Sequence, residues 1–194
     1  MILSSYSTGA VTSLTSFAGQ ISFTSGTVAT SYSTGNASGS SFVGGFVGYN
    51  VSGTAASAVI AKDYSTGQAT GVTTVGGFAG YNGNAIIDSV YATGATTLSN
   101  PLSSNPTGGL VAQNGSGTWT NSYWDVQSTG QGSGVSGTGY STVQMQTQSN
   151  FAGWDFTNVW QMPTGGGYPQ LRLGWDFTNV WQTVAGSPNP VLRP

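Results

Sequence analysis

The sequence predicts an all-β protein, a parallel β-solenoid (β-helix) built from coils of about 27–32 residues. Three observations lead to this prediction. A unit of Gly-Gly, a short apolar run, Asn and Tyr recurs through residues 1–127, and periods of this length indicate stacked supersecondary units. Gly, Ser, Thr, Val, Tyr and Phe dominate the composition, which favours strands separated by tight turns. Only 4% of the residues are charged, whereas 37% are hydrophobic, so the chain can bury a core.

The clearest copy of the unit is VGGFAGYNGNAIIDSVYATG at residues 75–94. Its Gly-Gly pair recurs every 32 residues, beginning at Gly44, Gly76 and Gly108. The tyrosines of the unit are spaced by either 26–27 or 32 residues, so a base unit sometimes carries about five extra residues. One insertion lies between Asn50 and Tyr64, and the other surrounds the segment SNPLSSNP at 99–106. We expect both to be loops.

Within one unit the apolar runs are 3–6 residues long and end at Gly, Asn or Ser, which fits strands better than helices. A unit has room for about three strands of 4–6 residues, each paired with its equivalent about 4.8 Å away in the next coil. In-register stacking then places like residues on one another. It predicts one internal column of Phe46, Phe78 and Leu110, and another of Tyr32, Tyr64, Tyr91 and Tyr123.

Asn50, Asn82 and Asn114 follow the apolar strand of their units at the same 32-residue spacing. Stacked asparagines can hydrogen-bond to one another along the axis as an amide ladder. Asn also tolerates the left-handed backbone of turns, which would explain its presence without a ladder. Both explanations can hold together, and both make these residues structural.

The composition changes after Trp119. We expect the chain to consist of three parts, residues 1–127, 128–152 and 153–194. The first part is the solenoid. The second contains the Gly/Ser-rich loop 128–139 and one expected short helix, with Ser141 or Thr142 as its N-cap and an end near Gln148.

The third part contains two 21-residue units, because GWDFTNVWQ at 153–161 recurs identically at 174–182. In each copy three aromatic side chains would alternate onto one face of a strand and require burial. We expect a Trp-rich C-terminal cap on the last open coil, since solenoids need capped ends. The second copy would be an extra coil or a strand that engages another subunit. The residues concerned are Trp154, Phe156, Trp160, Trp175, Phe177 and Trp181.

The sequence contains no His and no Cys, which removes imidazole bases, catalytic triads and thiolate metal sites. We therefore expect no enzyme, no metal and no cofactor. Asp155 and Asp176 occupy equivalent positions in the 21-residue units and would either hold a cation or share a proton, or else bond to their own turns. We favour the turns. With a net charge of −2 and no 18-residue apolar run, we expect neither nucleic-acid binding nor membrane insertion.

The segments GGFVGYN, GGFAGYNGNAIIDSVYATG and GGLVAQN resemble the GLUG-motif repeats of large bacterial surface proteins of the filamentous-haemagglutinin type. The later run SYWDVQSTGQ, followed by GTGYSTVQM, FAGWDF and GYPQLR, is similar to the segment that closes such arrays. The doubled GWDFTNVWQ departs from that pattern. The resemblance implies an exported solenoid, located outside the cell or at the bacterial cell surface.

The leading functional hypothesis is a structural or adhesive solenoid that assembles with itself. ILSSYSTG after Met1 matches the end of a unit, so the first coil should expose strand edges and favour head-to-tail stacking into a filament. The alternative is a module that binds host or matrix polysaccharide through Trp119, Tyr123 and Trp124. Ice binding is a third choice, although no regular Thr-x-Thr column is evident.

Overall fold

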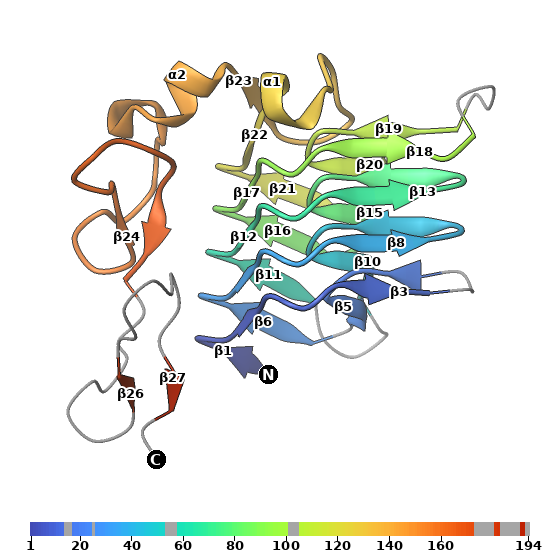
Figure 1. Cartoon of the computed structure of the whole chain (residues 1–194), viewed down its shortest axis with the longest axis horizontal. Helices are drawn as coiled ribbons and strands as arrows, with labels where there is room; N and C mark the ends of the chain where they lie inside the picture. Colours follow the sequence, from blue (N-terminus) through green and yellow to red (C-terminus); the bar gives the residue numbers. More distant parts are fainter. Residues whose placement is uncertain are drawn as a thin grey trace.

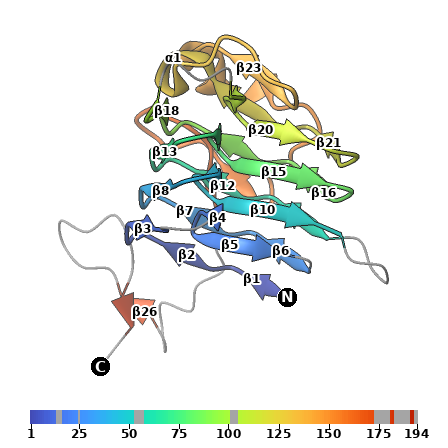
Figure 2. The same cartoon turned by 90° about the vertical axis from the view of Figure 1, so that its right-hand side faces the viewer.

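The computed structural model describes residues 1–13, 17–24, 26–52, 58–100, 105–172, 181–182 and 191–192, of which 22–24, 181–182 and 191–192 are described by their backbone alone. The described chain winds as a parallel β-solenoid whose coils stack along one axis (Figures 1 and 2). The predicted fold class is therefore confirmed. Figure 1 shows the first coil at one end of the stack and the two short helices at the other.

Each complete coil contains five short strands, one from each of five parallel sheets. Sheet I contains β1 (Ile2–Leu3), β6 (Thr27–Ala29), β11 (Val59–Ala61), β16 (Ile86–Asp88) and β21 (Thr118–Thr120). Sheet II contains β2 (Tyr6–Ser7), β7 (Tyr32–Ser33), β12 (Tyr64–Ser65), β17 (Tyr91–Ala92), β22 (Tyr123–Asp125) and β23 (Thr138–Tyr140). Sheet III contains β3 (Val11–Thr12), β8 (Ala37–Gly39), β13 (Ala69–Gly71) and β18 (Thr96–Leu98).

The remaining two sheets complete the coil. Sheet IV contains β4 (Phe17–Ala18), β9 (Phe42–Gly44), β14 (Thr74–Gly76) and β19 (Thr107–Gly108). Sheet V contains β5 (Ile21–Thr24), β10 (Val47–Val51), β15 (Ala79–Gly83) and β20 (Val111–Asn114). Five strands of two to five residues thus replace the three longer strands expected from the sequence. The predicted insertion at 99–106 falls between β18 and β19. The stretch between Asn50 and Tyr64 was expected to be a loop but contains β11, so that expectation is wrong for residues 59–61. Residues 53–57 and 101–104 of the two insertions lie outside the described residues.

Two kinds of corner explain why the strands are so short. The first is the turn between sheets I and II, where every coil places a residue other than glycine in the left-handed region. These residues and their φ angles are Ser4 (47°), Thr30 (53°), Lys62 (62°), Ser89 (53°) and Asn121 (44°). The second is the Gly-Gly turn between sheets IV and V, where a Cβ on Gly76 would collide with the Ala79 carbonyl oxygen.

The core of the coil stack is an in-register column of apolar side chains. Phe46 and Phe78 stack with ring centroids 4.8 Å apart and planes 8° from parallel, and Leu110 lies buried in the same cluster one coil further on. A second row lines sheet I with Val28, Ile60 and Ile87, all buried. The predicted Phe/Leu column is internal.

The tyrosine column lies on the outside of the coils, contrary to the expectation that it is internal. On sheet II the inward positions are small residues such as Ser65 and Ala92, because the Gly-Gly turns pass close behind them: a Cβ on Gly77 would lie 3.2 Å from the Ala92 Cβ. The interior has no room for a phenol there, so the tyrosines point outward. They pack instead in a separate cluster with aromatic residues of the C-terminal segment.

The C-terminal end of the core is closed by Trp124. This residue continues the column of Ser65 and Ala92. In the described part of the chain sheets IV and V end at β19 and β20, so the Trp124 indole has space to lie over Gly109. Trp124 is only 4% exposed and its Nε1 donates to the Gln131 carbonyl oxygen at 2.9 Å. Residues 126–139 cover this end, and β23 pairs with the outer edge of β22.

The described chain contains two helices of four residues where one was expected, and neither is long enough to cross a membrane. α1 (Val126–Thr129) begins at Asp125, whose carboxylate accepts hydrogen bonds from Gln127 N and Ser128 N. α2 (Thr142–Met145) begins at the predicted N-cap Ser141 with a capping box to Gln144. A 3₁₀ turn, η1 (Gln148–Asn150), follows.

After η1 the chain runs along the flank of the stack rather than across its open end (Figure 1). β24 (Trp160–Gln161) pairs antiparallel with β25 (Gln170–Leu171), and β26 (Trp181–Gln182) pairs antiparallel with β27 (Val191–Leu192). The two pairs repeat after 21 residues, as the duplicated sequence predicts. The first 21-residue unit therefore covers the side of the coil stack and not the last coil, where the cap was expected. The last coil is covered by Trp124 and residues 126–139.

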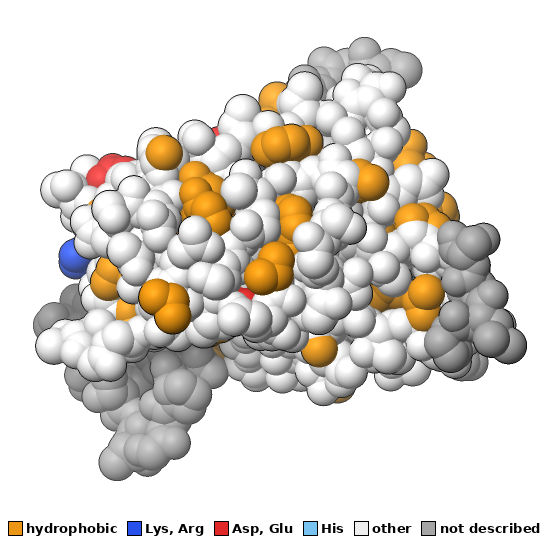
Figure 3. Space-filling view, turned by 90° about the horizontal axis from the view of Figure 1, so that it is seen from above, with side chains coloured by type: hydrophobic (Ala, Val, Ile, Leu, Met, Phe, Trp, Pro, Cys, Tyr) orange, Lys and Arg blue, Asp and Glu red, His pale blue; other side chains and the backbone are white. Residues whose placement is uncertain are grey.

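Charged groups are sparse on the folded surface. Figure 3, which views the helix-bearing end, shows hydrophobic side chains scattered among uncharged polar groups. Along the sequence the first charged side chain is Lys62, so the first two coils carry none.

Candidate functional site

The asparagine row forms a ladder inside the coils. Asn50 Nδ2 donates to Asn82 Oδ1 at 2.9 Å, and Asn82 Nδ2 donates to Asn114 Oδ1 at 3.1 Å. The amides of Asn82 and Asn114 also donate to turn carbonyl oxygens three residues further on, at Ala85 and Gly117. Asn50 and Asn82 are fully buried, so the row is structural and presents nothing to a ligand.

The tyrosine column is a stack of phenol rings on the outside of sheet II. Centroids of Tyr32 and Tyr64 are 4.9 Å apart, and those of Tyr64 and Tyr91 are 5.0 Å apart. Burial and the neighbouring phenol of Tyr6 raise the pKa of Tyr32 to about 12, and burial raises the pKa of Tyr64 and Tyr91 further. Tyr123 stacks on Tyr140, which belongs to β23. The column is thus kept neutral and is largely covered.

The first GWDFTNVWQ copy provides much of that cover. Trp154 and Trp160 stack with centroids 4.1 Å apart, and Trp160, which is fully buried, packs against Tyr64 and Tyr91. Trp154 Nε1 donates to the Asn121 carbonyl oxygen at 2.7 Å, and Tyr91 OH donates to the Pro169 carbonyl oxygen at 2.7 Å. These contacts fasten the segment to three successive coils.

The three aromatics do not alternate along a strand as expected. Only Trp160 and Gln161 are extended, and the preceding residues form a turn organised by Asp155. Its carboxylate accepts from Thr157 N, Asn158 N and Asn158 Nδ2, each at 2.9 Å, and these bonds lower the pKa of Asp155. Phe156 lies half-buried at the rim of the aromatic cluster.

The equivalents in the second copy, Trp175, Asp176 and Phe177, lie outside the described residues, and Trp181 is described by its backbone alone. Asp155 bonds to its own turn, as favoured from the sequence. The alternative, a site shared with Asp176, involves a residue outside those that the structure describes. Arg172 Nε donates to the Trp160 carbonyl oxygen at 2.9 Å.

Asp125 joins the end of the solenoid to the flank segment. Its Oδ2 accepts from Thr142 Oγ1 and from Tyr168 OH, both at 2.7 Å, while its Oδ1 accepts from the first amides of α1. Burial would raise the pKa of Asp125, but these hydrogen bonds outweigh it and hold the pKa below its ordinary value. All of this carboxylate's bonding capacity is used structurally.

Two of the three residues proposed for sugar contact cannot present a ring face. Tyr123 and Trp124 are 5% and 4% exposed, because one is covered by the C-terminal segment and the other closes the core. Trp119, which is 39% exposed, remains at the surface. It continues the inward row of Ile60 and Ile87 on β21, the last strand of sheet I among the described residues. The carbohydrate site as predicted from the sequence is therefore wrong for Tyr123 and Trp124.

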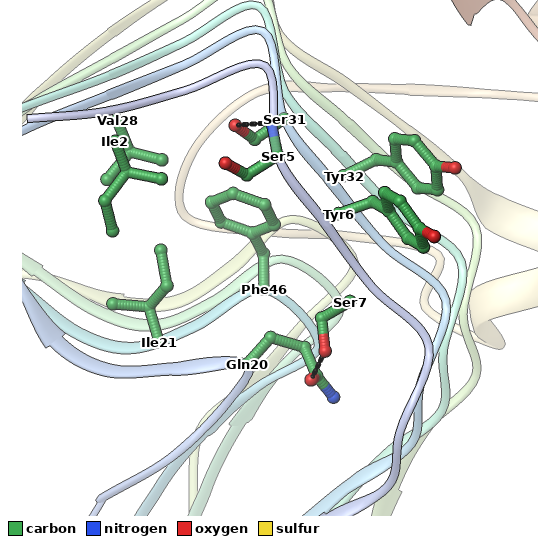
Figure 4. Close-up of a pocket in the computed structure, with 10 residues that line it drawn as sticks. All are labelled: Ile2, Ser5, Tyr6, Ser7, Gln20, Ile21, Val28, Ser31, Tyr32 and Phe46. Carbon is green, nitrogen blue, oxygen red and sulfur yellow. Dashed lines mark hydrogen bonds between the residues drawn. The ribbon is translucent and has the colours of Figure 1, made fainter. Parts of the chain in front are cut away.

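The N-terminal end of the stack carries a slot that opens into the core, with a volume of about 150 Å³ (Figure 4). Ile21 pairs with Val47, so the residues that precede them, Gln20 and Phe46, occupy equivalent positions in the first and second coils. The Gln20 amide bonds to the backbone, donating to the carbonyl oxygens of Gly9 and Gly35 at 3.0 and 3.2 Å, and it accepts from Ser7 Oγ. Gln20 therefore does not stack on Phe46 as Phe46 stacks on Phe78, although Phe46 is only 2% exposed.

The slot has an apolar floor and a polar rim. Phe46 and Val28 lie at its bottom and Ile2 and Ile21 at its side, whereas Ser5, Ser7 and Ser31 lie along one edge. The same view shows the rings of Tyr6 and Tyr32 on the other face of the chain from Phe46. All five strands of the first coil end their sheets, so strand edges surround the slot.

The buried carboxylate of Asp63 lies at the corner between sheets I and II, one coil beyond Ser31. Asp63 is fully buried; its Oδ1 accepts from Ser31 N at 2.6 Å, and its Oδ2 has no hydrogen-bond partner in the described part of the chain. Burial raises the pKa of Asp63 well above its ordinary value, against the effect of the backbone hydrogen bonds. The equivalent place holds Ser31 one coil before Asp63, Val90 one coil after it and Ser122 two coils after it. Ser31 Oγ and Ser122 Oγ accept from Ser5 N and Val90 N.

Sequence reasoning missed the slot and Asp63. The slot follows from the column Gln20, Phe46, Phe78, Leu110, in which one polar residue interrupts an apolar register. That interruption is visible once the register is known, and Gly19-Gln20 precedes Ile21 as Gly45-Phe46 precedes Val47. The sequence does not show that Asp63 points inward, because its direction depends on the left-handed corner at Lys62.

Comparisons with known proteins agree with the architecture. Residues 71–98 match the family model described as the GLUG motif. Among curated proteins none matches the sequence. A solved structure from Bacteroides ovatus, described as a "putative immunoglobulin A1 protease", superposes with a TM-score of 0.61 at 20% identity over 88% of this chain. The chain spans 57% of the length of that protein, and at this identity the likeness shows the fold alone.

Proposed function

We propose that this GLUG-motif β-solenoid is a rigid structural and adhesive module of an extracellular or cell-surface protein, without catalytic activity. The single observation that carries the proposal is the continuous in-register stacking of core, asparagine and tyrosine rows through successive coils, braced on one flank by Trp154 and Trp160. Such a body holds a fixed shape and offers long outer faces of uncharged polar groups.

The carboxylates support a structural assignment. Asp125 and Asp155 bond to helix and turn amides, and Asp63 is buried beneath the surface. Among the described residues no group of three or more potential metal ligands occurs together. The protease name of the solved relative belongs to that protein, and only the fold carries over.

The partners of such a module would be matrix or host polysaccharide, or a second copy of the chain. Beads coated with the folded chain should be retained under flow on immobilised matrix polysaccharides and proteins. Beads coated with Phe78→Asp, which places a charge in the core, should not be retained. Equal retention of both proteins would contradict an adhesive role of the folded surface. Trp119→Ala in the same assay tests the one predicted sugar-contact residue that remains exposed.

A further inference from the structure

The 21-residue unit that begins at Gly153, here the first unit, contacts the tyrosine column in regular steps. Trp154 packs on Tyr91 and Tyr123, and Trp160 packs on Tyr64 and Tyr91. Each tryptophan therefore spans two neighbouring coils, and the second of them lies one coil before the first.

The column continues into the two coils before those that the first unit covers. Tyr32 stacks on Tyr64 with centroids 4.9 Å apart, and Tyr6 stacks on Tyr32 with centroids 5.4 Å apart. The backbone pairing of sheet II keeps all three tyrosines in one register. The face that binds the first unit is thus continuous with an equivalent face on the two preceding coils.

The second 21-residue unit, which begins at Gly174, repeats the sequence that makes these contacts. Residues 174–182 are identical to residues 153–161. The strand pairing repeats as well, because Trp181 pairs with Leu192 as Trp160 pairs with Leu171. Figure 1 shows β26 and β27 further along the same flank than β24, in the direction of the first coil. The second unit therefore has the sequence, the strand register and the position to extend the contact along the column.

We propose that the second unit docks on the tyrosine column two coils before the first unit, with Trp175 on Tyr32 and Tyr64 and Trp181 on Tyr6 and Tyr32. The displacement is about 9.6 Å, because each unit supplies two tryptophans at steps of one coil. The unit follows the first directly in the chain, so its effective concentration at this face is high. This inference goes beyond the proposed function, because it assigns the duplicated sequence a binding site and a partner within the chain.

The two units differ where the first is anchored to the end of the coil stack. Tyr168 OH donates to Asp125 Oδ2, and the equivalent residue in the second unit is Asn189. One residue beyond the pairs that join β12, β17 and β22, the position of Asp125 is held two coils earlier by Thr66. The anchor of a phenol on a carboxylate is therefore specific to the first unit and its place, whereas the tryptophan contacts can be made at both places.

The first experiment measures nuclear Overhauser effects between ring protons in the unaltered chain. The expected result is cross-peaks from Trp181 to Tyr6 and Tyr32, of the same kind as those from Trp160 to the column. A mixture of isotope-labelled and unlabelled chains then identifies the partner. Trp181 cross-peaks that arise between different chains would mean that the unit binds a second copy, and would overturn the proposal. Trp160 cross-peaks without any from Trp181 would overturn it as well.

A substitution gives an independent measurement of the same contact. Trp181→Ala should raise the nitration rate of Tyr32, relative to that of Tyr91, by about tenfold, because two aromatic contacts no longer cover the Tyr32 ring. Tyr91 is the internal reference, since it is buried under the first unit. Thr178→Ala is the matched control, because its equivalent Thr157 is exposed, and should leave the ratio unchanged. Equal ratios in the two variants, both with a native circular dichroism spectrum, would contradict the docking.

Discussion

Asp63 Oδ1 accepts a hydrogen bond from the backbone amide of Ser31 at 2.6 Å, 32 residues earlier and one coil below. The carboxyl group takes the place of the serine hydroxyl that caps the equivalent amide one coil before it, at Ser31, and two coils after it, at Ser122. Unlike those hydroxyls, it has one oxygen that is buried without a partner among the described residues. Folding therefore favours its protonated form, and the pKa of Asp63 is raised well above 3.8.

The first prediction concerns pH. Since the folded protein holds the Asp63 proton more tightly than the unfolded chain, the stability from this group is fully present below pH 3.8 and is lost as the pH rises through the folded pKa. Asp63→Ser should keep the cap, raise the free energy of unfolding at pH 7 and flatten its decline above pH 3.8. Urea unfolding at several pH values measures this, and a wild-type stability that rises over that window would contradict it.

A second prediction concerns the left-handed corner. Lys62 has a φ of 62°, which costs an L-residue about 1–2 kcal/mol relative to right-handed backbone. Lys62→Asn should stabilise the protein by about 0.5 kcal/mol, whereas Lys62→Val, which is β-branched, should destabilise it by about 1 kcal/mol or more. Both variants remove the same charge, so thermal unfolding of the pair isolates the backbone effect. Equal shifts would mean that the corner is not under strain.

The flank cover gives a third prediction. Trp160→Ala should lower the free energy of unfolding by about 3–5 kcal/mol, because it empties a fully buried site against Tyr64 and Tyr91. Phe156→Ala, at the half-buried rim of the same cluster, should cost about 1–2 kcal/mol. Chemical denaturation followed by far-UV circular dichroism compares them. If the two losses were equal, the C-terminal segment would not hold the coils through Trp160.

The asparagine ladder gives a fourth prediction. Asn82 both accepts from Asn50 and donates to Asn114. Asn82→Ala therefore leaves the buried amide of Asn50 and the half-buried carbonyl oxygen of Asn114 without their ladder partner, and should cost about 2–4 kcal/mol. Asn114→Ala, at the end of the ladder, leaves one and should cost about half as much. Urea midpoints with unchanged m-values would measure these losses. A smaller loss at Asn82 than at Asn114 would exclude a cooperative ladder.

The sequence was sufficient for the fold because register in a solenoid follows from the repeat. The 32-residue spacing of Gly44, Gly76 and Gly108 places each strand on its equivalent, and Val75 does pair with Thr107, and Asn50 with Asn82. The number of strands per coil was wrong, since left-handed corners at residues such as Thr30 carry no glycine to mark them.

Whether a side chain points into the core or away from it was harder to infer from the sequence. A strand of two residues, such as Tyr64–Ser65, has no alternating pattern, and hydrophobicity alone places the tyrosine inside. The Gly-Gly turn behind Ser65 reverses this, because a Cβ on Gly45 would collide with the Ser65 hydroxyl. The interior behind sheet II is equally narrow in the earlier coils, so a Trp fits at position 124 only because β19 and β20 are the last described strands of their sheets.

Amide hydrogen exchange, followed by mass spectrometry at a concentration where the chain is monomeric, tests most directly whether the coils form one rigid in-register body. Residues 58–92 have paired strands above and below, so their amides should exchange last and as a group, well after those of residues 1–13 at the open end. If residues 58–92 exchanged as fast as residues 1–13, the ladders would not hold the coils together, and the structural function built on them would fail.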